Sequence, residues 1–262
     1  MLETLIFSLA VAAALGISAG YLGSIMVLEK MALVGDALSH VALPGLALGT
    51  LFGFNPLAGG FVFLFVSAVV IWYLCRVTKL SFETVVGATF TLALAIGILL
   101  FGDNLNSLEE ALFGNITAVG LTEAVAAVLI SVAVILLTKF IYRRMVLGLI
   151  SEELATSKGV SVARTNLLYL LLVSLTVAIG IQITGTLLVG FLVVTPAAAA
   201  KIISTNLFRY FTLSAIFGLI SAVTGILMAN YFNVFPGPLV VFAGISIFVI
   251  AIIIRWRLKV SS

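Results

Sequence analysis

Long apolar stretches recur along this chain from its first residues to its last, and each is long enough to cross a membrane. A transmembrane helix needs about 20 apolar residues to span a hydrocarbon core about 30 Å thick. Hydropathy places such stretches near residues 5–28, 32–51, 57–75, 83–101, 122–141, 167–182, 183–203, 207–229 and 238–254. The sequence therefore predicts an all-α, polytopic helix bundle of about eight or nine spans. The boundary near residue 182 is the hardest to place and leaves eight to ten crossings open.

The composition excludes a water-soluble protein. The chain is 63% hydrophobic and 9% charged, whereas soluble domains carry roughly 25% charged residues. We therefore expect a single membrane domain over residues 1–262. The first apolar stretch has no basic residue before it and exceeds the roughly 7–15-residue core of a signal peptide, so we predict that it is a retained span. The net charge of +3 comes from residues in short loops, and no nucleic-acid partner is expected.

The loops differ in charge, and the difference predicts an orientation. Segment 102–121 carries Asp103, Glu109 and Glu110 and no Lys or Arg. Basic residues lie instead in the loops between other spans and in the tail after the last span. They are Arg76, Lys79, Arg143, Arg144, Lys158, Arg164, Lys201 and Arg209 in the loops, and Arg255, Arg257 and Lys259 in the tail. Because basic loops stay on the cytoplasmic side, we predict nine crossings of the cytoplasmic membrane, with the N-terminus outside and the C-terminus inside.

The second apolar stretch contains a carboxylate and the only histidine of the chain. Asp36 and His40 are four residues apart, which places them on one helix face with Cβ atoms roughly 5–6 Å apart. Inserting an ionisable side chain at membrane depth costs about 2.5–3.5 kcal/mol on insertion scales, so the presence of two in one span requires a functional or structural explanation. One reason is metal binding, since imidazole with carboxylate suits Zn²⁺, Mn²⁺ or Fe²⁺. A hydrogen-bonded pair that only joins helices, or an Asp36 hydrated near the inner end, fits the sequence equally well.

Proline interrupts two of the predicted spans. Pro44, followed by Gly45, removes the N–H that would bond the carbonyl of His40, and Pro196 does the same to the carbonyl of Leu192. Irregular backbone at membrane depth is tolerated where it is buried in protein or lines a cavity, and transporter sites are often built at such interruptions. We therefore expect helix breaks at Pro44 and Pro196 beside a translocation pathway.

The loop after the fifth span has the pattern of a short helix with both ends marked. Ser151 can cap its start, Glu152 and Glu153 suit the positive end of the helix dipole, and Gly159 can adopt the left-handed conformation that ends it. A helix of two turns is marginal alone in water and needs a surface to pack against. The sequence contains no phosphate-binding Gly-x-x-x-x-Gly-Lys-Ser/Thr motif, so any use of ATP requires a separate protein.

Together these elements resemble the permease family of ATP-binding-cassette (ABC) importers for zinc, manganese and iron, with the type II importer fold. The resemblance covers nearly the whole chain. Its most specific match is Gly35 to Gly49, Gly-Asp-Ala-Leu-Ser-His-Val-Ala-Leu-Pro-Gly-Leu-Ala-Leu-Gly. Further matches are Leu112-Phe113-Gly114-Asn115, the stretch from Thr186 to Ala200, and Glu153-x-Ala155 with Gly159.

The resemblance implies a permease without a resident cofactor, whose cargo is a divalent metal ion and whose ATP is hydrolysed by another subunit. It implies a homodimer or pseudodimer, two cytoplasmic ATPases and an extracytoplasmic metal-binding solute protein. Asp36 and His40 would be the metal ligands. The segment with Glu152, Glu153, Ala155 and Gly159 would be the coupling helix, near residues 152–159, that docks onto the ATPase.

Other functions stay open at this point. A permease for cobalamin, haem or a siderophore is similar in architecture but would not need an Asp–His pair. A secondary metal transporter would work without an ATPase, and a membrane scaffold would transport nothing. An intramembrane enzyme is disfavoured because Ser39 and His40 are adjacent and therefore point about 100° apart on a helix.

Overall fold

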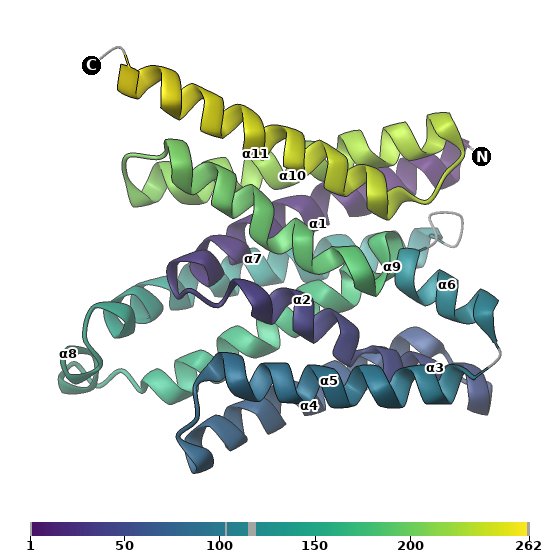
Figure 1. The fold of residues 1–262 in the computed structure, drawn as a ribbon, viewed down its shortest axis with the longest axis horizontal. Coiled ribbons are helices and arrows are strands. Elements are labelled where there is room, and N and C mark those ends of the chain that lie inside the picture. The colour runs from purple at the N-terminus through teal and green to yellow at the C-terminus, as the bar shows by residue number, and fades with distance from the viewer. Residues whose placement is uncertain (1, 103, 115–118, 261–262) are drawn as a thin grey trace.

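Every regular element of the described structure is an α-helix, as predicted. The computed structural model describes residues 2–102, 104–114 and 119–260, so Asp103 and Asn115 lie outside the described residues. The elements in chain order (Figure 1) are α1 (Leu2–Leu28), α2 (Ala32–Val41), α3 (Leu43–Phe52), α4 (Pro56–Thr78), α5 (Phe82–Phe101), α6 (Leu105–Phe113), α7 (Leu121–Ile150), α8 (Glu152–Ser157), α9 (Val162–Ile203), α10 (Leu207–Phe232) and α11 (Pro236–Val260).

Nine helical segments in the described ranges are long and apolar enough to cross a membrane. Helices α2 and α3 together form one broken span over Ala32–Phe52, and α9 contributes two spans, Val162–Gln182 and Thr184–Ile203. In Figure 1 the N-terminus and α6 lie at one end of the bundle, and the C-terminus and α8 lie at the other. Termini at opposite ends are what an odd number of crossings requires.

The uncertain boundary near residue 182 is a corner inside α9. Gly185 has φ 73° and ψ 174°, and the residues around it are helical. Figure 1 shows α9 running along the bundle and turning back at this corner. Glycine adopts positive φ without the steric cost that a Cβ atom brings. A Cβ atom on Gly185 would also lie 2.1 Å from the carbonyl oxygen of Leu112 in α6, so the corner needs glycine for two reasons.

The prediction of a helix break at Pro196 is wrong. Helix α9 continues through Pro196 to Ile203, and the non-helical residue of α9 is Gly185, eleven positions earlier. Proline removes one backbone hydrogen bond, and membrane proteins tolerate this loss where neighbouring helices compensate. The corner of α9 instead falls at Gly185, whose φ of 73° is a conformation that proline, with φ fixed at about −65°, cannot adopt.

The break expected at Pro44 is confirmed. Helix α2 ends at Val41, α3 begins at Leu43, and Ala42 lies between them. The Ala42 N–H donates to the carbonyl of Ser39, three residues back, at 3.3 Å. Pro44 occupies the first turn of α3, where its missing N–H is tolerated, and the carbonyl of His40 consequently loses its usual donor four residues ahead.

Glycine contacts hold the spans close together, as small residues do in membrane bundles. Helix α1 packs along α10. A Cβ atom on Gly16 would lie 2.4 Å from the carbonyl oxygen of Gly218, and one on Gly20 would lie 2.2 Å from that of Ser214. Helix α9 lies against this pair, and α2, which carries the residues of the candidate site, packs on α9.

Candidate functional site

Asp36 and His40 lie one turn apart on α2, and His40 is the last residue but one before the break. The helix is buried on most sides by α5 and α9. The interruption at Ala42, followed by Pro44 and Gly45, begins directly after this pair. A Cβ atom on Gly45 would lie 2.2 Å from the carbonyl oxygen of Gly59, so Gly45 allows α3 to approach α4 closely.

The His40 imidazole is buried and has an unused nitrogen. Its exposed fraction is 7%, and its ring packs against Phe90 of α5 with the ring centroids 5.3 Å apart. Within the described part of the chain, Nδ1 of His40 has no hydrogen-bond partner. Buried polar atoms are normally paired, so this imidazole nitrogen is available to a ligand.

The Asp36 carboxylate is exposed on the surface of the single chain. Among the described residues, no hydrogen bond joins its side chain to His40, so the alternative of a hydrogen-bonded Asp–His pair gains no support. The described ranges also contain no group of three or more His, Cys, Asp and Glu side chains that could hold a metal ion. One copy therefore offers two candidate ligands, one buried and one exposed.

The second half of α9 holds α2 in place through contacts that the sequence analysis missed. The Ser39 hydroxyl lies within hydrogen-bonding distance of the carbonyl oxygens of Asp36 and Thr186. A Cβ atom on Gly190 would lie 2.4 Å from the Cα atom of Asp36. Gly190 is one of several glycines in its span, and its spacing gives no sign of which helix it meets, so the contact was not predictable.

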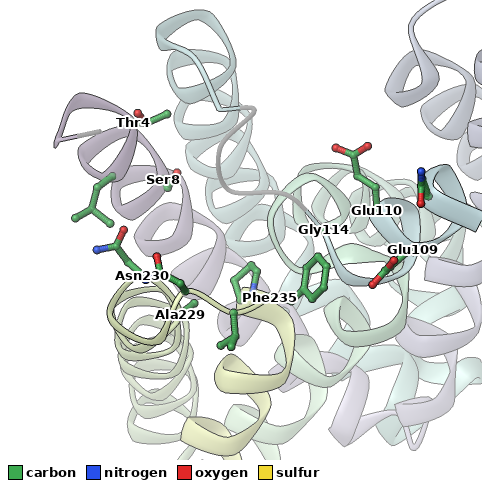
Figure 2. Close-up of a pocket in the computed structure, with 13 residues that line it drawn as sticks. Thr4, Ser8, Glu109, Glu110, Gly114, Ala229, Asn230 and Phe235 are labelled. Atoms are coloured by element: carbon green, nitrogen blue, oxygen red, sulfur yellow. The ribbon is translucent and has the colours of Figure 1, made fainter.

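A cleft of about 720 Å³ opens at the end of the bundle that carries α6. It lies between the start of α1, helix α6 and the turn from α10 to α11, and Figure 2 shows Glu109 and Glu110 on α6 beside it. Asn230 and Phe235 line it from the opposite side. Among the described residues that line this cleft there is no lysine or arginine, in keeping with the acidic outer face that the loop charges predict.

The predicted short helix after the fifth span is confirmed as α8. The Ser151 hydroxyl accepts a hydrogen bond from the N–H of Leu154 at 3.1 Å. Gly159 has φ 73°, and the Val160 N–H donates to the carbonyl of Ala155 at 2.9 Å across the stop. Ala155 is fully buried, whereas Glu152 and Glu153 are exposed. Helix α8 is thus anchored to the bundle on one face and open on the other.

A nine-span bundle with a broken helix, a buried imidazole beside the break and an anchored helix at one end is typical of a membrane permease. The profile of the ABC 3 transport family matches residues 1–255, and the chain belongs to this family. It is the membrane permease of an ABC importer, and ATP hydrolysis in this family is carried out by a separate subunit.

Several characterised relatives match over most of their length. The chain is 31% identical to the manganese transport system membrane protein MntC of Listeria monocytogenes, over 90% of this chain and 85% of MntC. It is 32% identical to the manganese import system permease ScaB of Streptococcus parasanguinis, over 94% and 89%. It is 30% identical to the high-affinity zinc uptake system membrane protein ZnuB of Buchnera aphidicola, over 88% and 90%.

Solved structures agree with the fold. A chain of PsaBC from Streptococcus pneumoniae, solved in complex with Fab, superposes with a TM-score of 0.85 at 32% identity, covering 99% of this chain and 96% of that one. An inward-facing metal-chelate type ABC transporter superposes with a TM-score of 0.74 at 18% identity, covering 96% and 85%. At that identity the second match supports the type II importer fold alone.

Proposed function

We propose that this permease imports manganese or zinc ions and that Asp36 and His40 are ligands in the translocation pathway. The observation that carries the proposal is the buried, unpartnered Nδ1 of His40, one helical turn from a carboxylate and directly beside a helix break. Imidazole and carboxylate together suit both ions. Relatives that are 30–32% identical transport manganese or zinc, which supports the same cargo.

The proposed site is shared between two copies of the chain. One copy supplies two candidate ligands, and no third is present among its described residues. A twofold interface brings the same patch of each subunit together. The exposed position of Asp36 allows two carboxylates and two imidazoles to meet across such an axis and surround one ion.

The ATPase partner is proposed to dock onto α8. The buried Ala155 fixes the helix against the membrane domain, and Gly159 sets the turn into α9. Glu152 and Glu153 face outward, where a partner can reach them. Because the second half of α9 contacts Asp36 through Gly190, movement of α8 and α9 is transmitted to the metal ligands, as alternating access requires.

On the opposite face, an extracytoplasmic solute protein is proposed to deliver the ion. The acidic residues near the cleft, Glu109 and Glu110, lie at that end of the bundle. Negative potential at a binding face raises the local concentration of cations. Delivery at this face and release at the α8 face give the direction of import.

The test is ATP-dependent uptake of radioactive Mn²⁺, Zn²⁺ and Fe²⁺ into proteoliposomes that contain the permease with its ATPase and binding protein. We expect His40→Ala and Asp36→Asn each to lower uptake at least tenfold, on the scale at which loss of supporting groups weakens metal sites. Glu83→Gln, an exposed carboxylate in the first turn of α5, serves as the matched control and should leave uptake unchanged.

Each alternative gives a different result in the same assay. Unchanged uptake by both variants, with the complex intact, would refute the assignment of Asp36 and His40. Absence of uptake for all three free ions would favour a metal chelate as cargo. Uptake without the ATPase under an ion gradient would identify a secondary transporter.

A further inference from the structure

The inner end of α7 carries three cationic side chains within six residues. Lys139, Arg143 and Arg144 are all exposed on the single chain. Lys139 and Arg143 are four residues apart, which places them on the same helix face. Arg144 follows Arg143 directly and points about 100° away from it, but it is exposed as well, so the three positive charges lie at the same level on the exposed side of α7, here called the α7 basic patch.

The α7 basic patch lies at the depth of the inner lipid headgroups. Helix α7 has 30 residues, so it is about 45 Å long at 1.5 Å per residue, whereas the hydrocarbon core is about 30 Å thick. The helix begins at Leu121, at the α6 end of the bundle, and ends at α8. Lys139 to Arg144 therefore lie around the point, about 20 residues in, where a helix leaves the hydrocarbon.

The residues along the same face favour a lipid. Leu129 is 65% exposed, Leu136 is 61% exposed and Phe140 is 66% exposed, so an apolar stripe leads along the helix to the basic patch. The guanidinium of Arg144 lies over the Phe140 ring, 5.1 Å from its centroid. A guanidinium stacked in this way keeps its edge N–H groups free for a phosphate. Among the described residues, no carboxylate pairs with these three cations.

A second copy of the chain is a poorer occupant of this face. Helix α7 packs on α1 and α9, whereas Asp36 lies on α2, which packs on α5 and α9. A twofold contact at the Asp36 pair therefore does not by itself require the outer face of α7. A separate symmetric contact there would bring like charges together, because each subunit presents the same patch.

We propose that the α7 basic patch binds an anionic phospholipid of the inner leaflet. Arg143 and Arg144 hold the lipid phosphate, and Lys139 extends its ammonium group from the hydrocarbon edge to the same headgroup. The acyl chains lie along Leu136 and Phe140. This binding site is independent of the proposed metal pathway.

The experiment is native mass spectrometry of the assembled permease–ATPase complex in detergent, titrated with phosphatidylglycerol or with phosphatidylcholine. The test variant is the double substitution Arg143→Gln with Arg144→Gln. The matched control is Arg209→Gln with Arg257→Gln, which removes two exposed arginines from other helices at the same end of the bundle. We expect the test variant to bind phosphatidylglycerol about tenfold more weakly or worse, since each basic residue near an anionic lipid surface contributes a severalfold attraction.

The control and the parent should retain phosphatidylglycerol, and phosphatidylcholine should bind no variant preferentially. Added phosphatidylglycerol should raise the thermal unfolding midpoint of the parent and the control but not that of the test variant. Equal retention of phosphatidylglycerol by the test variant and the control would overturn the proposal. Binding of phosphatidylcholine as strong as that of phosphatidylglycerol, or competition by inorganic phosphate alone, would also overturn it. Loss of dimer with unchanged lipid binding would assign the patch to a second copy.

Discussion

At the scale of single residues, the position of Asp36 depends on a residue that has no side chain. Gly190 of α9 lies against the backbone of Asp36, where any Cβ atom would overlap its Cα. The neighbouring Ser39 joins α2 to the carbonyl of Thr186. Both contacts fix the backbone that carries the proposed metal ligands, and neither contact provides a ligand itself. The geometry of the proposed site is therefore set by the α2–α9 contact.

Gly190→Ala should disrupt the site without removing a ligand. The added methyl group would lie 2.4 Å from the Cα atom of Asp36 and 2.6 Å from its backbone nitrogen, so α2 must shift. Overpacking of this kind costs typically about 1–3 kcal/mol. We expect a lower thermal unfolding midpoint for the assembled permease and a lower rate of metal uptake.

Gly87→Ala is the matched control for this substitution. Gly87 lies within α5, and a Cβ atom there meets nothing within 4 Å. Its unfolding midpoint should be unchanged or slightly higher, because alanine is favoured over glycine in a helix by about 1 kcal/mol. Equal midpoints and equal uptake for the two variants would show that the α2–α9 contact does not position Asp36.

At the scale of elements, α9 is the helix that connects the regions of the permease. It starts directly after α8, turns at Gly185 against α6, and returns past Asp36. Its last turn is tied to α11, since Arg255 donates to the carbonyl of Ile202 at 2.7 Å. Helix α9 therefore connects both ends of the bundle to α2.

Gly185→Ala should lower the free energy of unfolding by more than the strain of a positive φ alone explains. The substitution meets both the backbone strain of φ 73° and a carbonyl oxygen 2.1 Å away in α6. Gly53→Ala is the matched control, because Gly53 has φ 71° with nothing within 4 Å. Strain alone costs about 1–2 kcal/mol. We expect denaturant unfolding to give a clearly larger loss for Gly185→Ala than for Gly53→Ala, and equal losses would exclude close packing of the corner on α6.

Some of these elements could be predicted from the sequence, and others could not. The spans were predictable because each is apolar over the full thickness of a bilayer, and Asp36 and His40 stood out because ionisable groups are rare at that depth. The break at Pro44 was predictable from a missing N–H. The corner at Gly185 was not, because most membrane glycines serve packing and only the fold shows which one reverses the chain. The predicted break at Pro196 was wrong, because a membrane helix can continue through a proline when neighbouring helices compensate for the lost hydrogen bond.

At the scale of the whole molecule, the two ends of the bundle differ in charge. The end with α6 carries Glu109 and Glu110, and the end with α8 carries basic residues such as Arg76 and Lys158. The rule that basic loops remain inside predicts that α8 lies in the cytoplasm, where an ATPase can reach it. This orientation supports the assignment of the delivery and coupling faces.

Orientation can be measured by labelling introduced cysteines. In a Cys75→Ser background, Val234→Cys and Thr205→Cys place one exposed thiol at each end of α10. We expect a membrane-impermeant maleimide to label Val234→Cys in intact cells, and Thr205→Cys only after permeabilisation. The reverse pattern would invert the orientation and remove α8 from contact with a cytoplasmic ATPase.

The number of ions bound per chain tests whether the site belongs to a dimer. Because one copy supplies one carboxylate and one imidazole to the proposed site, and no described group of three or more candidate ligands exists, we expect calorimetric titration of the purified permease with Mn²⁺ or Zn²⁺ to give one ion for two chains. Light scattering on the same sample should report a dimer. Asp36→Asn should abolish this binding while the dimer persists, since metal sites built from carboxylate and imidazole lose affinity when an anionic ligand is removed. One ion for each chain, retained by a monomer, would show instead that each copy completes its own site and would rule out the shared arrangement.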